Sequence, residues 1–273
     1  MLYKYVPSDR VDILENLTLR FTPHPSLNDP FECWPRFSLA KDYEKSIEEF
    51  RERMTRQMGE LVQDASPESK ARADEILARG LKEVEARAAS LEAEGNPEMM
   101  DSFAQGISDK RGILCLTRTW DNLLMWSHYG ENHKGVVIGF DESHRFFDDE
   151  SELGCDCGLR DVQYPDQRPT FDAIESFDVL TTKAPVWRYE EEVRAMRLFR
   201  EEDRPIGTDP DGMPIVLVDF PKELVQQVIV GAQAEEALLA RCQKALRDNE
   251  MPWVSVKKVA LSRRDFSLQL EAS

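Results

Sequence analysis

The sequence predicts an α+β fold, a single mixed domain with a central antiparallel-rich sheet and a helical-hairpin insertion. Three observations predict it. Short apolar runs typical of strands recur along the chain. A segment at about 41–100 is highly charged, with apolar residues at helical spacing. The 273 residues, 41% of them hydrophobic, suffice to bury one large core.

The N-terminal part supplies the first elements of the core. We expect a strand at Leu2–Tyr5, a short helix at Val11–Leu17 and a second strand at Leu19–Thr22. The loop that follows, residues 23–31, contains three prolines. Because proline restricts the backbone, this loop should hold Asn28 and Asp29 in one orientation.

Residues 41–100 predict an antiparallel pair of helices. Ser66 precedes Pro67 and is the expected N-cap of the second helix. Both helices are too polar to form a core by themselves, so each should present one apolar stripe. Two interpretations remain open, a lid or partner-binding arm and a solvated structural insertion.

The block Gly112–Phe140 concentrates aromatic and ionisable residues between two strand-like runs, Ile113–Leu116 and Val136–Phe140. Such a concentration between buried strands predicts a binding or active site. We expect the block to contribute Trp126, His128, Tyr129, His133 and Lys134.

The remaining elements follow from the same periodicities. After an acidic, glycine-containing loop at 148–168, we expect a helix at Phe171–Leu180, a segment Trp187–Phe199 that ends as a strand, strands at Ile215–Phe220 and within Leu224–Gly231, a helix at Ala234–Asn249, and strands at Val254–Leu261 and Phe266–Leu270.

Composition excludes several classes of protein. The net charge of −17 opposes a broad duplex nucleic-acid surface, although a small nucleotide ligand or a nucleic-acid end remains possible. Neither a secretory signal nor a long apolar span is evident, which predicts a cytoplasmic protein without membrane contact. The glycine-rich phosphate loops of kinases, P-loop ATPases and dinucleotide-binding dehydrogenases are absent from the sequence, as is a nucleophile elbow.

The sequence does not predict a metal site. The five cysteines are expected to be reduced, and Cys155 and Cys157 stand too close together for a usual zinc knuckle. His128 and His133 are five residues apart, whereas two ligands on one helix would be three or four apart. A hydrogen bond from His128 to a substrate and an anion contact from Lys134 are more natural roles.

The segment Trp187–Arg194 contains a run of three glutamates. Strand periodicity would place Glu190, Glu192 and Arg194 on one face, where they could act as an acid/base pair, a metal site or a clamp for a ribose. The alternative is a solvated edge strand. Trp187 and Tyr189 favour the lip of a cleft instead.

These blocks together resemble a bacterial family known as domain of unknown function 2971. The resemblance lies in Leu2–Tyr5, Asn28–Phe31, Leu114–Leu116 followed by Met125–Tyr129 and His133–Gly135, Thr182–Lys183 with Trp187–Arg194, and Ile229–Ala232. The family implies no established activity.

A weaker likeness, in the order of the elements, is to ADP-ribosyltransferases. It implies an NAD-using enzyme of the toxin or phage-defence effector type that transfers ADP-ribose to an unknown acceptor. A first-strand residue would hold the nicotinamide-side ribose, an aromatic ring would stack on nicotinamide, and a late glutamate would bind the ribose 2′-hydroxyl. In this chain these places fall to Tyr3 or Tyr5, Thr117, Tyr129, and Glu190 or Glu192.

Two other classes of function remain open. A metal-dependent nuclease or phosphodiesterase would use Asp29, His128, Glu190 and Glu192. A non-enzymatic nucleotide sensor would use the same pocket, with the helical hairpin transmitting the signal. For every class, the residues expected to form the site are Tyr3, Tyr5, Asn28, Asp29, Thr117, Trp126, His128, Tyr129, Lys134, Glu190, Glu192 and Arg194.

Overall fold

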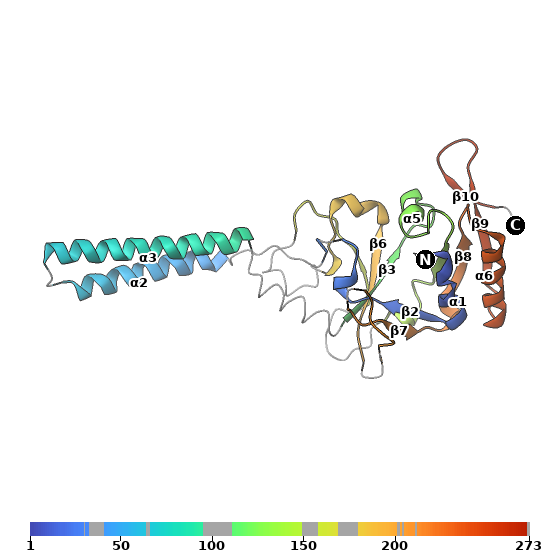
Figure 1. Cartoon of the computed structure of the whole chain (residues 1–273), viewed down its shortest axis with the longest axis horizontal. Helices are drawn as coiled ribbons and strands as arrows, with labels where there is room; N and C mark the ends of the chain where they lie inside the picture. Colours follow the sequence, from blue (N-terminus) through green and yellow to red (C-terminus); the bar gives the residue numbers. More distant parts are fainter. Residues whose placement is uncertain are drawn as a thin grey trace. The chain divides into compact units, whose positions relative to one another are not determined.

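The structure, a computed structural model, describes residues 1–29, 31–32, 41–63, 66–94, 111–148, 158–168, 180–200, 203, 205–210 and 212–271. The chain divides into two compact units. One unit contains the helices α2 (Lys41–Leu61) and α3 (Pro67–Glu94), and the other contains the strands and the remaining helices (Figure 1). The predicted α+β class is confirmed.

An eight-stranded sheet forms the larger unit, in the order β10-β9-β8-β4-β1-β3-β6-β5. All neighbouring strands are antiparallel except β8 and β9, which are parallel. The strands are β1 Leu2–Val6, β3 Arg111–Thr117, β4 Val136–Phe140, β5 Gly158–Asp161, β6 Glu192–Leu198, β8 Val225–Val230, β9 Ser255–Leu261 and β10 Leu268–Leu270.

Both faces of this sheet are buried at its central strands. Successive side chains of a strand point to opposite faces. Val136 and Ile138 of β4 therefore pack with Leu2 in one hydrophobic cluster, whereas Val137 packs with Tyr5 in a second. This arrangement explains why β4 is apolar throughout instead of alternating.

Different elements cover the two faces. The first cluster also takes in α1 (Asp12–Asn16), α6 (Glu236–Asp248) and the two-stranded sheet of β2 (Thr18–Phe21) and β7 (Val216–Asp219). The second takes in Met125 and Trp126 of α5 (Leu123–His128). The short 3₁₀ turns are η1 Ser8–Val11, η2 His24–Ser26, η3 Arg145–Phe147, η6 Pro185–Glu190 and η7 Lys222–Leu224.

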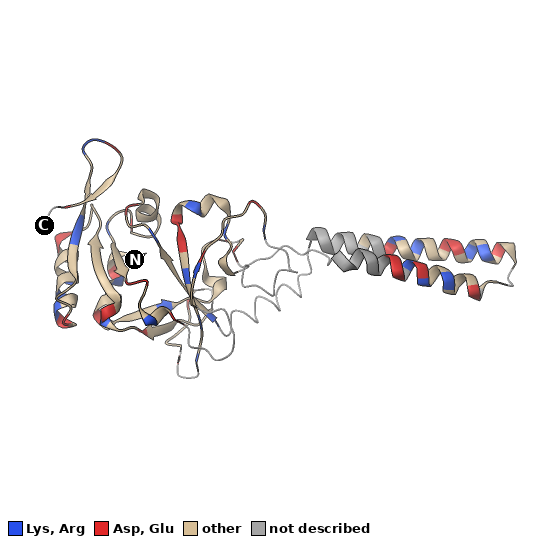
Figure 2. Ribbon diagram, turned by 180° about the vertical axis from the view of Figure 1, so that it is seen from behind, with Lys and Arg blue, Asp and Glu red and all other residues tan. Residues whose placement is uncertain are grey.

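The insertion contains two helices, as the sequence predicts. The Ser66 hydroxyl accepts a hydrogen bond from the amide of Ser69 at 3.3 Å, which is the expected N-cap contact. Acidic and basic residues recur along the parts of both helices whose side chains the structure describes, which are coloured in Figure 2. None of the described helices is both long and apolar enough to cross a membrane.

The structure corrects the sequence interpretation at three places. Residues 158–161, expected in a loop, form the edge strand β5 because they pair with β6. As a result, β6 is internal, and the solvated edge strand considered for its glutamates is wrong. Glu190 lies in η6 and not in a strand, since Glu191 adopts a left-handed conformation (φ 43°) that separates η6 from β6. Except for Leu180, the expected helix at Phe171–Leu180 lies outside the described residues, as do Cys155 and Cys157.

Candidate functional site

A cavity of about 220 Å³ opens where β1 and β3 separate. The two strands share a single register pair, Tyr3 with Thr117, whereas β1 pairs with β4 along its whole length. Beyond that pair, the ammonium group of Lys4 donates to the carbonyl of Cys115 at 3.2 Å and so bridges the gap. Both strands therefore present side chains to the cavity.

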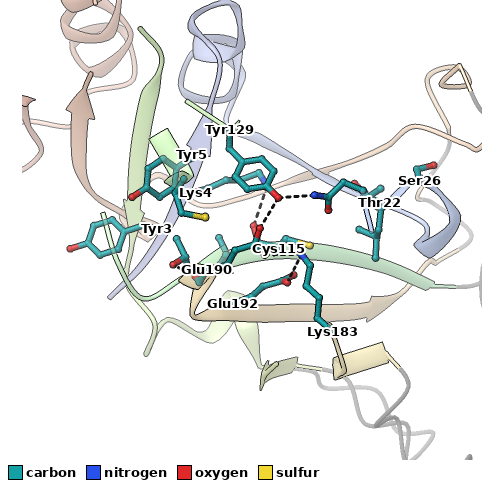
Figure 3. Close-up of a pocket in the computed structure, with 15 residues that line it drawn as sticks. Tyr3, Lys4, Tyr5, Thr22, Ser26, Cys115, Tyr129, Lys183, Glu190 and Glu192 are labelled. Atoms are coloured by element: carbon teal, nitrogen blue, oxygen red, sulfur yellow. Dashed lines mark hydrogen bonds and ion pairs between the residues drawn. The ribbon is translucent and has the colours of Figure 1, made fainter. Parts of the chain in front are cut away.

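Aromatic rings form much of its wall. Figure 3 shows Tyr3 and Tyr5 on one side of the cavity and Thr22 and Ser26 on the other. The Tyr5 hydroxyl donates to the carbonyl of Thr119 at 3.1 Å, which holds the ring in place. Burial raises the pKa of Tyr5 and of Tyr3, so both rings are neutral and could pack on a flat ligand.

A chain of hydrogen bonds crosses the cavity. The Asn28 amide donates to the Tyr129 hydroxyl at 2.7 Å, and that hydroxyl donates to Oε1 of Glu190 at 2.7 Å (Figure 3). Burial and the bond to Glu190 both raise the pKa of Tyr129, which therefore remains a donor. The chain joins the loop after β2, the end of α5 and the late glutamate.

A buried ionic cluster of five side chains forms part of the cavity wall, since Lys183, Glu190 and Glu192 line the cavity. Nζ of Lys183 is 2.7 Å from Oε2 of Glu190 and 3.2 Å from Oε2 of Glu192. Arg194 bonds the other Glu192 oxygen at 2.9 Å and also pairs with Glu32. The three carboxylates outnumber the two cations, and all five side chains are at most 7% exposed.

Burial and the neighbouring charges shift the pKa values within the cluster. Burial lowers the pKa of Lys183, but the carboxylates of Glu192 and Glu190 outweigh burial, so the net pKa is raised and the ammonium stays charged. Burial raises the pKa of Glu192, and Lys183 opposes this. Burial also lowers the pKa of Arg194. Glu190 differs from Glu192 because it also reaches Tyr129 at the cavity wall.

The structure brings most of the expected site residues together. Those that line the cavity are Tyr3, Tyr5, Asn28, Thr117, Tyr129, Glu190 and Glu192. The Thr117 hydroxyl donates to the Glu190 carbonyl, so it supports the backbone beside that carboxylate. The predicted convergence of Asn28 with Glu190 is thus observed, through Tyr129.

Five of the twelve residues expected to form the site do not line this cavity. Trp126 is fully buried in the second cluster, where its ring nitrogen donates to the Trp120 carbonyl at 2.8 Å. Lys134 is exposed and lines a separate pocket with Glu131 and Arg241. Periodicity cannot foresee this, because it does not indicate which way the turn after α5 directs each side chain.

The other three lie behind or beside the cavity. Asp29 is buried and accepts a hydrogen bond from the amide of Phe31 at 2.9 Å. Arg194 is held beneath Glu192 within the ionic cluster. His128 is exposed, and its Nδ1 lies 2.9 Å from the hydroxyl of Tyr189.

The sequence analysis missed Lys4, Cys115 and Lys183, all of which line the cavity. Lys183 had a signal, since it belongs to the Thr-Lys element of the family resemblance. Lys4 and Cys115 had the same kind of signal, since the family resemblance also includes Leu2–Tyr5 and Leu114–Leu116. Burial raises the pKa of Cys115 well above its ordinary value, so the thiol is protonated.

Among the described residues, no group of three or more histidine, cysteine, aspartate or glutamate side chains is arranged to hold a metal ion. Of the residues assigned to a metal-dependent site, His128 bonds Tyr189, whereas Glu190 and Glu192 bond Lys183.

Comparison with known proteins shows a similarity to a family over part of the chain. A family model described as a protein of unknown function (DUF2971) matches residues 125–195. The matched segment runs from Met125 to Ala195 and contains Tyr129, Lys183, Glu190 and Glu192 of the site. The chain thus resembles this family over that region. No curated protein and no solved structure matches the chain significantly.

Proposed function

We propose that the cavity binds NAD and that the protein is an ADP-ribosyltransferase-like enzyme, which transfers ADP-ribose from NAD to an acceptor. The observation that carries this proposal is the position of Glu190, whose carboxylate lies at a cavity walled by Tyr3, Tyr5 and Tyr129. Flat neutral rings beside a fixed carboxylate suit an aromatic base attached to a ribose.

The arrangement matches the electrostatics of the reaction. When the bond between the ribose C1′ and the nicotinamide nitrogen breaks, both electrons leave with nicotinamide, which departs uncharged. The ribose then carries positive charge, which a nearby carboxylate stabilises. The acceptor's nucleophilic atom bonds C1′ and releases its proton to solvent.

Lys183 and Tyr129 would prepare Glu190 for this role. Lys183 contacts Oε2 at 2.7 Å, and Tyr129 donates to Oε1. Each carboxylate oxygen has two lone pairs, so both can still accept a hydrogen bond from a ribose hydroxyl. Glu192 is the weaker candidate because Lys183 and Arg194 hold it on both sides.

The test measures release of nicotinamide from NAD by the purified chain, alone and with cell extract or nucleic acid as acceptor. Glu190→Gln should reduce turnover by about a hundred- to a thousandfold, since one preorganised electrostatic partner is lost. Glu271→Gln, at an exposed position directly after β10, is the matched control and should leave turnover unchanged.

Three results would contradict the proposal. They are activity that survives Glu190→Gln, activity that disappears with a chelator, and no binding of NAD. NAD that binds and stays intact with every acceptor would favour a non-enzymatic nucleotide sensor.

A further inference from the structure

The cavity is small for a whole dinucleotide. Its volume of about 220 Å³ lies below the range of about 300–1,000 Å³ that is usual for small-molecule sites. If the cavity holds the nicotinamide end of NAD, the adenine end must lie outside it. A second aromatic base then needs a surface beside the cavity.

An aromatic surface lies directly beside the cavity pair of Tyr129 and Glu190. Tyr129 follows His128 in the chain, and Glu190 follows Tyr189. The inner pair is joined by a hydrogen bond of 2.7 Å, and the outer pair is joined by a contact of 2.9 Å between Nδ1 of His128 and the Tyr189 hydroxyl. The same two elements, α5 and η6, thus fix both pairs.

Trp187 completes this surface, which we call the aromatic lip (His128, Trp187 and Tyr189). The ring centroid of Trp187 lies 6.4 Å from that of His128 and 6.1 Å from that of Tyr189. The lip remains accessible, because His128 is exposed and the other two side chains are half-buried.

One side of Trp187 is already occupied. Nζ of Lys183 lies over its ring, 5.0 Å from the centroid. Lys183 is only 5% exposed, so its ammonium covers the inner side of the ring. This cation–π contact fixes the ring in advance, and because the ring is only half-buried, part of it can still contact a ligand.

We propose that the aromatic lip is a second subsite, which stacks the purine base of a dinucleotide whose other end enters the cavity. This inference rests on the proposed function and adds to it a second subsite, for the purine base. Nucleobases stack readily on tryptophan, tyrosine and histidine rings. The site should therefore prefer purine dinucleotides to nicotinamide mononucleotide.

The test uses two half-ligands, AMP for the lip and nicotinamide mononucleotide for the cavity, together with NAD. Dissociation constants are measured by calorimetry for the wild type, Trp187→Leu and Trp187→Phe. Trp187→Leu keeps an apolar side chain but removes the ring, so it should weaken the binding of AMP and of NAD by roughly five- to a hundredfold. Trp187→Phe should restore much of this loss.

Nicotinamide mononucleotide should bind wild type and Trp187→Leu within about twofold, since the mutation removes only a stacking contact at the lip. Phe266→Ala removes the 97% exposed ring between β9 and β10 and should change no affinity.

The outcomes separate the two proposals. Unchanged AMP and NAD affinities in Trp187→Leu would overturn the lip and leave the cavity function standing. Equal weakening of all three ligands would also overturn it, because the ring would then act only through Lys183 and Glu190. If AMP binding depends on the Trp187 ring and nicotinamide mononucleotide does not bind, the result would support the lip and count against NAD as the ligand of the cavity. No binding of any nucleotide would refute both.

Discussion

Lys183 allows a stringent test of the buried ionic cluster, because its ammonium group contacts three carboxylates. It lies 2.7 Å from Glu190, 3.2 Å from Glu192 and 3.7 Å from Glu32. Lys183→Met keeps the chain length and apolar bulk but leaves buried carboxylates without this cation. Breaking a buried ion pair by removing one partner typically costs about 3–5 kcal/mol. At about 2–4 °C per kcal/mol, the melting temperature should fall by roughly 6–20 °C.

The loss of stability caused by Lys183→Met should grow as the pH rises. In the variant, buried carboxylates that have lost their cation take up protons at a higher pH than in the unfolded chain. Raised folded-state pKa values make the destabilisation larger as pH rises. The gap between variant and wild type should therefore narrow between pH 7 and 5. In the wild type, the contribution of Lys183 should persist to above pH 10, because its folded pKa is raised.

Thermal and denaturant unfolding at several pH values measure these effects. Lys222→Met is the matched control, because Lys222 pairs with Glu250 at the surface at 3.5 Å and such pairs contribute about 0–1 kcal/mol. A double-mutant cycle of Lys183→Met with Glu190→Gln should give a coupling of about 1–3 kcal/mol. Zero coupling, or a melting temperature equal to that of the wild type, would refute the buried cluster.

Three further predictions concern other parts of the structure. Tyr129→Phe removes the hydrogen-bond donor to the Glu190 carboxylate and should lower the free energy of unfolding by about 1.5–3 kcal/mol. Asn28→Ala, at an exposed position, should lower it by less than about 1 kcal/mol. Equal effects of the two substitutions in denaturant unfolding would contradict this. Gly231→Ala places a Cβ 2.1 Å from the His133 carbonyl oxygen and should destabilise by at least about 1–3 kcal/mol, whereas Gly207→Ala has open space and should be close to neutral in the same assay. Replacing residues 41–94 by a flexible linker should leave one cooperative melting transition, because no side chain that the structure describes in this segment belongs to either hydrophobic cluster of the sheet unit. A lost transition in calorimetry would place the hairpin in the core.

Local sequence patterns determined most elements of this protein. The apolar run Val136–Phe140 predicted a central strand, and it is a strand buried on both faces. The charged segment with helical spacing predicted the pair α2 and α3, including the cap at Ser66. These features depend on residues close together in the chain, so periodicity and capping suffice to predict them.

Other features depend on contacts between distant segments. The separation of β1 from β3 follows from strand pairing, which places only Tyr3 opposite a residue of β3, Thr117, while all of β1 pairs with β4. Glu190 reaches the cavity through η6 and a left-handed residue instead of through strand alternation. No pattern in either local segment encodes such a pairing.

The orientation of side chains also could not be predicted from the sequence. Trp126 and Lys134 belong to one motif, yet the first is buried in the core and the second is exposed at another pocket. Lys183 and Glu32 belong to no catalytic motif. Both are buried, however, and their opposite charges pair with one another. Buried charges must be paired, and only the tertiary fold decides which residues far apart in the chain become neighbours.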